Sequence, residues 1–191
     1  MDRKIRLGMI GGGPDAFIGA VHRKAAALDG HFELVCGAFS RSYEKCKETG
    51  EALQLSSDRI YESYDKMFEE ELNLPEEQRM DAVSIVTPNH VHFDPAKKAL
   101  ENGFHVIIDK PIAFTLDEAK ELQELTESTG CVLALTHTYT GYPMIKEAKQ
   151  RIADGQIGDL RKIYVEYPQG WLATPLEEEG NKQASWRTDP E

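Results

Sequence analysis

The chain has 191 residues, with 22 Lys and Arg against 33 Asp and Glu, which gives a formal net charge of -11. This acidic balance argues against nucleic acid and anionic membrane surfaces as partners, and no apolar run approaches the roughly 20 residues that a membrane helix needs. The length suits one complete domain and part of a second, and a first stretch without the apolar core of a signal peptide favours a cytoplasmic location.

Between Ile5 and Thr136, short apolar runs alternate with longer amphipathic segments. This alternation is typical of repeated strand-helix-strand units around a buried parallel sheet. It predicts strands over residues 5–10, 32–39, 82–86, 105–109 and 132–136, with a short one over 59–61. Helices are predicted between them, over residues 19–28, 42–53, 64–72, 94–102 and 115–129. The predicted fold class is α/β, a Rossmann-like doubly wound parallel sheet.

The pattern changes after Thr136. A further helix is predicted over residues 143–154, and residues 160–173 then alternate in the manner of a half-exposed antiparallel strand. We therefore expect residues 1–140 to form one domain and residues 141–191 to be the incomplete start of a second domain of the α+β type.

The first predicted strand runs into a glycine-rich turn that opens the first helix. Backbone N–H groups and a helix N-terminus meet the pyrophosphate of a dinucleotide in this setting. A strict G-x-G-x-x-G would place its third glycine where Ala16 stands, and the next glycine is Gly19, so we expect a stretched loop. A plain glycine-rich turn is the alternative. The predicted cofactor contacts of the loop are Gly11, Gly12, Gly13, Ala16, Phe17 and Ile18.

Ser40 and Arg41 directly follow the second predicted strand. The adenosine ribose of a dinucleotide normally meets the residue there, about 20 positions past the glycines. An Asp or Glu would accept from the 2′-hydroxyl and repel a 2′-phosphate, whereas a hydroxyl and a guanidinium can bind that phosphate. The sequence thus favours NADP over NAD. Alternatively, Ser40 only caps the following helix.

Two further segments follow predicted strands and so reach the same edge of the sheet, where doubly wound folds bind ligands. They are Thr87-Pro88-Asn89 and Asp109-Lys110-Pro111. With the glycine loop, they resemble the T-P-x and E-K-P segments of the Gfo/Idh/MocA family, named for glucose-fructose oxidoreductase, inositol dehydrogenase and rhizopine catabolism. The similarity extends over essentially the whole chain.

The resemblance implies an NAD(P)-dependent oxidoreductase that transfers a hydride between nicotinamide and a hydroxyl or carbonyl of a sugar or polyol-like substrate. Lys110 would be the catalytic lysine that reaches both nicotinamide and the substrate hydroxyl, since such a lysine can polarise or deprotonate an alcohol. Pro111 would aim it through a special peptide bond such as a cis one. A surface turn is the alternative for this segment. The implied cofactor contacts are Thr87, Pro88, Asn89, His92, Asp109 (in place of the usual Glu), Lys110 and Pro111.

By the same resemblance, Tyr139 and Tyr142 would border the substrate pocket beside Lys110, with core packing as the alternative. Residues 1–140 would be the dinucleotide-binding domain, and residues 141–191 the start of a substrate-binding and oligomerisation domain. The D-x-x-x-H motif that holds the family's catalytic aspartate and histidine has no match in this sequence. We expect a homo-oligomer for the full-length form.

Two other functions fit the same residues: a dinucleotide-binding protein without catalysis, or an interaction module whose second sheet pairs with another chain. No metal site is predicted, because the His, Asp and Glu residues lack a tight ligand spacing. The three cysteines, Cys36, Cys46 and Cys131, are also too far apart in sequence to suggest a metal or redox pair.

Overall fold

A computed structural model describes residues 3–14, 16–171, 173–176, 178, 180 and 184 of the chain. The chain divides into two compact units, Met1–Gly141 and Tyr142–Glu191. All strands in the described residues belong to the first unit. None of the described helices combines the length and the apolar character needed to cross a membrane.

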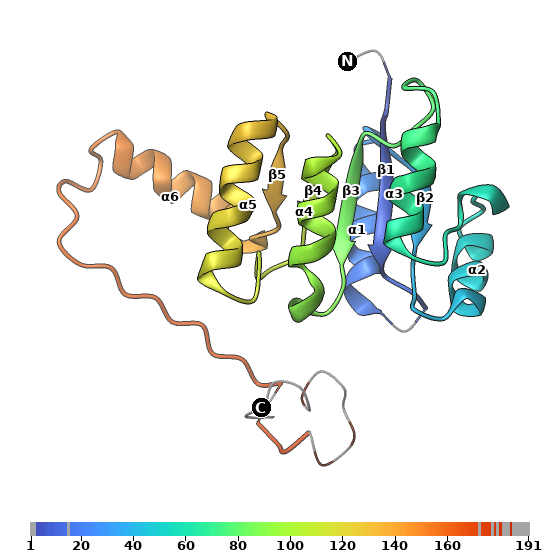
Figure 1. Ribbon diagram of the computed structural model, residues 1–191. Helices are drawn as coiled ribbons and strands as arrows, with labels where there is room; N and C mark the ends of the chain where they lie inside the picture. The colour runs from blue at the N-terminus through green and yellow to red at the C-terminus, as the bar shows by residue number, and fades with distance from the viewer. Residues whose placement is uncertain are drawn as a thin grey trace. The chain divides into compact units, whose positions relative to one another are not determined.

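The first unit is built on a parallel sheet of five strands in the order β2-β1-β3-β4-β5 (Figure 1). The five main predicted strands each end within one residue of the observed ends, because strands buried on both faces are near-continuous apolar runs. The strands are β1 Ile5–Gly11, β2 Phe32–Ala38, β3 Ala82–Val86, β4 His105–Ile108 and β5 Leu133–Leu135.

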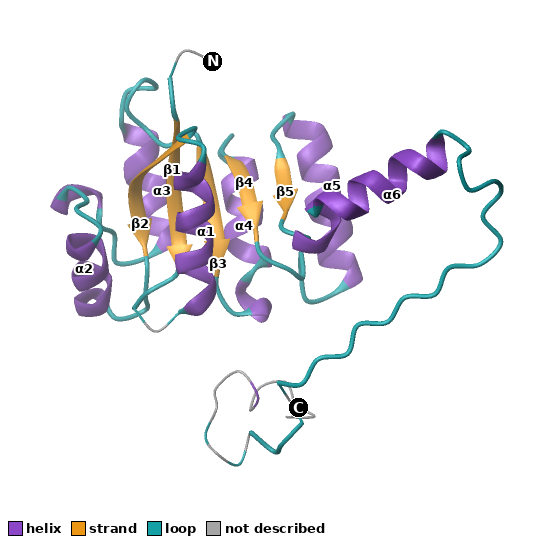
Figure 2. Ribbon diagram, turned by 180° about the vertical axis from the view of Figure 1, so that it is seen from behind, coloured by secondary structure: helices purple, strands orange, loops and turns teal. Residues whose placement is uncertain are grey.

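Helices cover both faces of this sheet. The helices α3 (Tyr64–Asn73), α4 (Phe93–Glu101) and α5 (Leu116–Thr129) pack on one face, and α1 (Phe17–Leu28) packs on the other (Figure 2). The helix α2 (Tyr43–Ala52) lies beside β2. Because the connections from β1 to β2 and from β2 to β3 pass on opposite faces, the strand order reverses beside β1, and this is the point where doubly wound sheets bind ligands.

Two short predictions near the sheet need correction. Residues 59–61 form no strand: Ser57–Arg59 is a short 3-10 helix, and only Ile60 pairs with the sheet, through a single parallel bridge to Gly37. The chain leaves the sheet at once because Ser63 already caps α3, its side chain accepting from the Lys66 N–H. The helix α1 begins at Phe17 rather than residue 19, so it takes up the end of the expected loop.

The second unit contains the helix α6, Pro143–Ala153, which begins with a proline in its first turn. The antiparallel strand predicted over residues 160–173 is wrong, since the described residues of this range form no strand. Their apolar side chains are exposed, among them Ile163, Tyr164 and Val165. A strand needs a neighbour that takes up its main-chain N–H and C=O groups, and no described segment pairs with this one.

The three cysteines are free thiols, and each is buried. Cys36 lies in β2, Cys46 in α2 and Cys131 just before β5. Burial raises the pKa of the Cys36 thiol well above its usual value, and the nearby Glu71 carboxylate adds to this. The thiols are therefore part of the packed interior.

Candidate functional site

The turn after β1 is built from glycines that side chains could not replace. Gly11 and Gly12 have φ angles of +83° and +77°, which L side chains rarely adopt. A side-chain carbon on Gly19 would lie 2.4 Å from the Cα atom of Gly12. The start of α1 therefore packs directly on the turn, and Gly19 provides the room for this close contact.

The N-terminus of α1 is open to an anion. Its N-cap residue, Ala16, makes no side-chain cap hydrogen bond, and its first turn holds no acidic residue. The helix α5 is the opposite case, because Thr115 and Glu118 form a full capping box at its N-terminus. The N–H groups of the first turn of α1, which no described side chain caps, and the positive end of the helix dipole favour a phosphate group at this turn.

Arg23 supports the turn from within α1, and no pattern in the sequence singles it out. Its Nη1 donates to the Gly12 carbonyl oxygen at 2.9 Å and contacts the Met9 sulfur at 3.4 Å. Burial lowers the pKa of the Arg23 guanidinium. With its carbonyl oxygen held by Arg23, Gly12 is fixed against the helix.

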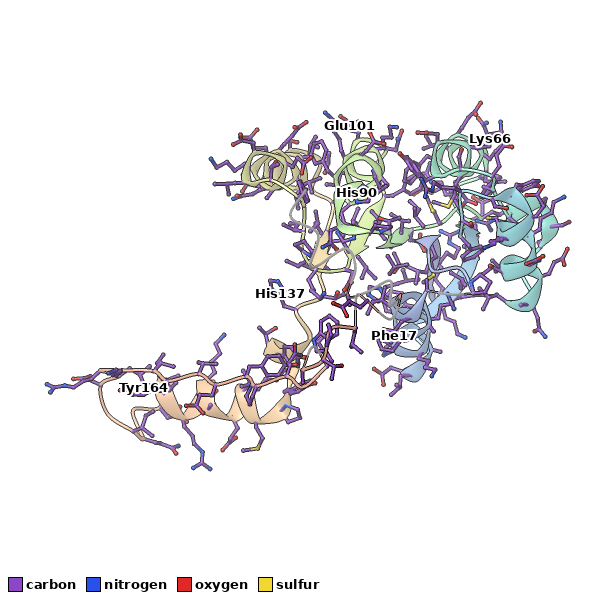
Figure 3. The ribbon with its side chains drawn as sticks, turned by 90° about the horizontal axis from the view of Figure 1, so that it is seen from below. Phe17, Lys66, His90, Glu101, His137 and Tyr164 are labelled. Carbon is purple, nitrogen blue, oxygen red and sulfur yellow. The ribbon has the colours of Figure 1, made fainter. Side chains whose placement is uncertain are left out.

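A cleft of about 570 Å³ lies at the carboxyl edge of the sheet. Figure 3 looks onto this edge, with Phe17, His90 and His137 labelled at the ends that follow β1, β3 and β5. The predicted site residues that line the cleft are Gly11, Gly12, Gly13, Ala16, Ser40, Arg41, Thr87 and Pro88. The polar lining residues that the sequence did not predict are Lys45, Glu62, Ser63, Tyr64 and His90.

One end of the cleft carries two positive charges. Arg41 follows β2, and Lys45 comes from the first turn of α2. The Ser40 hydroxyl accepts a hydrogen bond from the Ser42 N–H at 3.2 Å, so it takes part in the turn into the helix and keeps its own proton to donate. Lys45 could have been found from its place one turn after Arg41 on a predicted helix.

Tyr64 lines the cleft because of a contact between segments that are distant in the sequence. The bridge between Gly37 and Ile60 brings the segment before α3 back to the end of β2. Burial raises the pKa of Tyr64 to about 12, and the hydrogen bond that its hydroxyl donates to Asp94 (2.7 Å) adds to this. Tyr64 is therefore a neutral phenol at physiological pH.

Thr87 follows β3 and presents an orphaned hydroxyl. Its Oγ1 atom is buried and has no hydrogen-bond partner among the described residues. A buried hydroxyl without a partner costs about 1–3 kcal/mol, and a ligand in the cleft that supplied the partner would recover that energy. The glycine turn, the open helix N-terminus and this hydroxyl together fit a dinucleotide.

Lys110 follows β4 at the same edge. Its side chain is exposed and makes no hydrogen bond or ion pair with the described residues. Its peptide bond to Pro111 is cis. On its other side, the Asp109 carboxylate accepts from Thr136 Oγ1 at 3.1 Å and lies 4.0 Å from His22 Nε2. Burial lowers the pKa of His22, although Asp109 opposes this.

Other predicted residues lie outside the cleft lining. Phe17 is 78% exposed, Ile18 packs into the core beside β1, and Asn89 begins a short 3-10 helix after β3. His92 is fully buried, and Asp109, Lys110 and Pro111 lie beyond the cleft along the edge.

The two tyrosines predicted to border a substrate lie in different units. Tyr139 follows β5 and is 53% exposed, whereas Tyr142 belongs to the second unit and is 49% exposed. The alternative that either ring packs in the described core is therefore wrong. Within the described part of the chain, no three His, Cys, Asp or Glu side chains are grouped to hold a metal ion.

Comparison with known protein families adds to this geometry. Residues 5–137 match the family model GFO_IDH_MocA, described as "Oxidoreductase family, NAD-binding Rossmann fold". An oxidoreductase of Bacillus subtilis, YfiI, is 36% identical over all of this chain, which covers 48% of that protein. The levoglucosan dehydrogenase of Pseudarthrobacter phenanthrenivorans is 28% identical over 97% of this chain and 45% of its own length. The chain thus spans about half the length of these curated relatives.

Solved structures give the same result. An inositol dehydrogenase homologue of Azotobacter vinelandii with bound NAD+ superposes with a TM-score of 0.93 at 38% identity, over 100% of this chain and 48% of that one. Its complex with NADH and myo-inositol gives a TM-score of 0.88 at 37% identity, over 94% of this chain and 47% of that one. Both are similar over the whole or nearly the whole of this chain.

Proposed function

The chain belongs to the oxidoreductase family with an NAD-binding Rossmann fold, and on that premise we propose that it binds a nicotinamide dinucleotide along the carboxyl edge of its sheet. The observation that carries the proposal is the open N-terminus of α1, which lies on a glycine turn and shares a cleft with the orphaned Thr87 hydroxyl. These groups can receive a pyrophosphate and a polar group further along the dinucleotide.

The proposed reaction is hydride transfer involving a hydroxyl or carbonyl group of a sugar or polyol-like substrate. When bound, the nicotinamide ring supplies the hydride donor or acceptor. Lys110 donates a proton to the substrate oxygen as the ammonium, or accepts one from it as the neutral amine, and its exposed and unengaged side chain supports this role. Relatives named for levoglucosan and inositol support this substrate class. Assembly as a homo-oligomer and substrate contacts by Tyr139 and Tyr142 stay predictions.

For the choice of cofactor, NADP is proposed in preference to NAD. Ser40 offers a hydroxyl proton, and Arg41 and Lys45 add two positive charges at the end of β2, which suits a 2′-phosphate. The Azotobacter homologue holds NAD+ or NADH, so the preference rests on the charges of this chain alone.

Titration of the chain with NADPH and with NADH, followed by calorimetry, tests both statements. Binding of either dinucleotide supports the proposed site, and tighter binding of NADPH supports the role of Arg41. The Arg41→Asp variant is expected to reverse the preference. The matched control Lys47→Asp changes the same charge on α2 outside the cleft lining and should leave the ratio of the two affinities unchanged. Failure to bind either dinucleotide would contradict the proposed function.

A further inference from the structure

His92 lies fully buried behind the carboxyl edge, where α4 begins. Both nitrogens of its ring face main-chain oxygens. The Nε2 atom lies 2.9 Å from the Thr87 carbonyl oxygen, and the Nδ1 atom lies 2.7 Å from the Pro111 carbonyl oxygen. Since carbonyl oxygens only accept, a neutral ring donates to one of these two oxygens and only the protonated ring donates to both. The ring is fully buried and offers no surface to a ligand.

The two oxygens belong to loops that follow neighbouring strands. Thr87 follows β3 and Pro111 lies beyond β4, and these strands pair in parallel register. The hydrogen bond from the Asp109 N–H to the Ile85 carbonyl oxygen, at 3.1 Å, extends that pairing past the end of β4. His92 links the two loops further out, by side-chain contacts to the main chain.

Each of these loops carries one polar group that the described residues leave unengaged. Thr87 presents its orphaned hydroxyl, and Lys110 presents an ammonium without a partner among the described residues. Lys110 also lies between two fixed neighbours, because Asp109 accepts from Thr136 at 3.1 Å and the Pro111 carbonyl oxygen meets His92. The backbone at Lys110 is thus held from both sides while its side chain stays available.

We propose that His92 is a positioning residue, which holds the Thr87 and Pro111 loops at a fixed separation so that the Thr87 hydroxyl and the Lys110 ammonium address the same bound ligand. The inference rests on the proposed function and refines it. His92 acts through main-chain atoms and does not touch the dinucleotide, in contrast to the direct contact that the family resemblance implies. Its loss should therefore weaken binding of the nicotinamide part of the dinucleotide and not of the adenosine part.

The test compares binding of the whole dinucleotide with binding of a fragment that lacks nicotinamide. Calorimetry gives Kd for whichever of NADPH and NADH binds more tightly, and for the same molecule without nicotinamide, 2′-phospho-ADP-ribose or ADP-ribose. Four proteins are compared with the wild type: His92→Phe, His92→Asn, His92→Gln and the control His105→Phe. His105 lies at the opposite end of β4, where its Nδ1 accepts from the Val132 N–H at 3.0 Å.

His92→Phe is expected to lower the affinity for the dinucleotide about fivefold relative to the fragment, as for the loss of a positioning hydrogen bond. The fragment itself should bind as in the wild type. Asn keeps a donor near the Nδ1 position and Gln keeps one near Nε2, so each should restore part of the ratio. His105→Phe should leave it unchanged.

Two outcomes would overturn the inference: an unchanged ratio of the two affinities, as when both ligands are weakened equally, or a wild type that binds the fragment as tightly as the dinucleotide. If circular dichroism shows that His92→Phe does not fold, the Asn and Gln variants decide in the same way. A folded wild type that binds neither ligand would defeat the proposed function itself, which is a separate result.

Discussion

The two ends of the same sheet use polar side chains in opposite ways. At the amino end, Asp81 accepts from Arg3 at 2.6 Å and from Arg6 at 2.7 Å, and Arg6 also donates to the Glu76 carbonyl oxygen. At the carboxyl end, Thr87 Oγ1 and the Lys110 ammonium have no partner among the described residues. Among the described residues, one nitrogen of Arg6, Nη1, also has no partner, but the rest of its guanidinium is held by hydrogen bonds.

A second paired network lies between α3 and the segment that enters β3. Glu71 is fully buried and accepts from the Arg59 guanidinium, from the Tyr61 hydroxyl at 2.9 Å and from the Met80 N–H at 2.7 Å. The comparison teaches that this chain separates stability from binding: polar groups that hold the fold satisfy one another, and polar groups that await a ligand do not.

Breaking the Glu71 network should have the largest effect on stability. Arg59→Met removes the cation and leaves the Glu71 carboxylate buried without its charge partner. The free energy of unfolding, measured with urea, is expected to fall by about 3 kcal/mol. The double variant Arg59→Met/Glu71→Gln removes the buried charge but keeps a side-chain oxygen to accept from Tyr61 or Met80, so it should recover most of the loss, and cofactor affinity should not change in the folded protein. A loss below about 1 kcal/mol, as for an exposed pair, would contradict the comparison.

Asp81→Asn tests the amino end and its pH dependence. Partial burial acts to raise the pKa of Asp81, but hydrogen bonds from Arg3 and Arg6 outweigh it and hold the pKa well below its usual value. The stabilisation is therefore complete above the unfolded-state pKa, at about 3.9, and is lost as the pH falls toward the folded-state pKa.

The Asn variant is expected to be about 2 kcal/mol less stable at neutral pH. It should also lose less stability than the wild type when the pH is lowered from about 5 to about 2. Urea midpoints measured across this range check both expectations. Parallel pH profiles for the two proteins would show that Asp81 is not a source of acid sensitivity.

Gly19→Ala tests the carboxyl end. The added carbon would lie 2.4 Å from the Gly12 Cα atom, so α1 must move away from the turn. Cofactor affinity should fall about tenfold, which corresponds to overpacking of about 1.4 kcal/mol. Gly141→Ala is the matched control, because nothing lies within 4 Å of its added carbon. Equal cofactor affinities for the two variants would show that the turn before α1 does not contribute to cofactor binding.

Thr115→Ala should have the smallest effect. It removes the N-cap side chain of α5, which accepts from the Glu118 N–H at 3.2 Å. Stability is expected to fall by about 1 kcal/mol, while the Kd for the dinucleotide stays the same, because α5 is capped by its own residues and does not receive the ligand. Thr115→Ser keeps the cap and should behave as the wild type. A large change in Kd would show that the two helix N-termini are not as different as their caps indicate.

The sequence predicted most of the fold because its strands are local patterns. The segment that forms β3 is a run of apolar residues and Ser84 with the predicted bounds. The cleft was predicted only where its residues lie beside such a strand, as with the glycine turn, Ser40 and Thr87. Tyr64 depends on the distant Gly37–Ile60 bridge, and no local pattern shows that pairing.

Alternation alone was not enough for residues 160–173. Period-two patterning predicts a strand only where another strand is present to pair with it, and the described residues provide none. The contacts of His92 were hidden for a related reason, since its partners are carbonyl oxygens on two loops and main-chain oxygens leave no trace in a sequence.

The three buried cysteines give this chain built-in reporters of local opening. Alkylation requires an accessible thiolate, and each thiol is enclosed in the folded state: Cys36 in β2, Cys46 in α2 and Cys131 before β5. Pulse labelling followed by mass spectrometry would therefore time the exposure of three separate parts of the unit. If bound dinucleotide protects Cys46 from alkylation and leaves Cys131 unaffected, the ligand stabilises the half of the sheet beside α2.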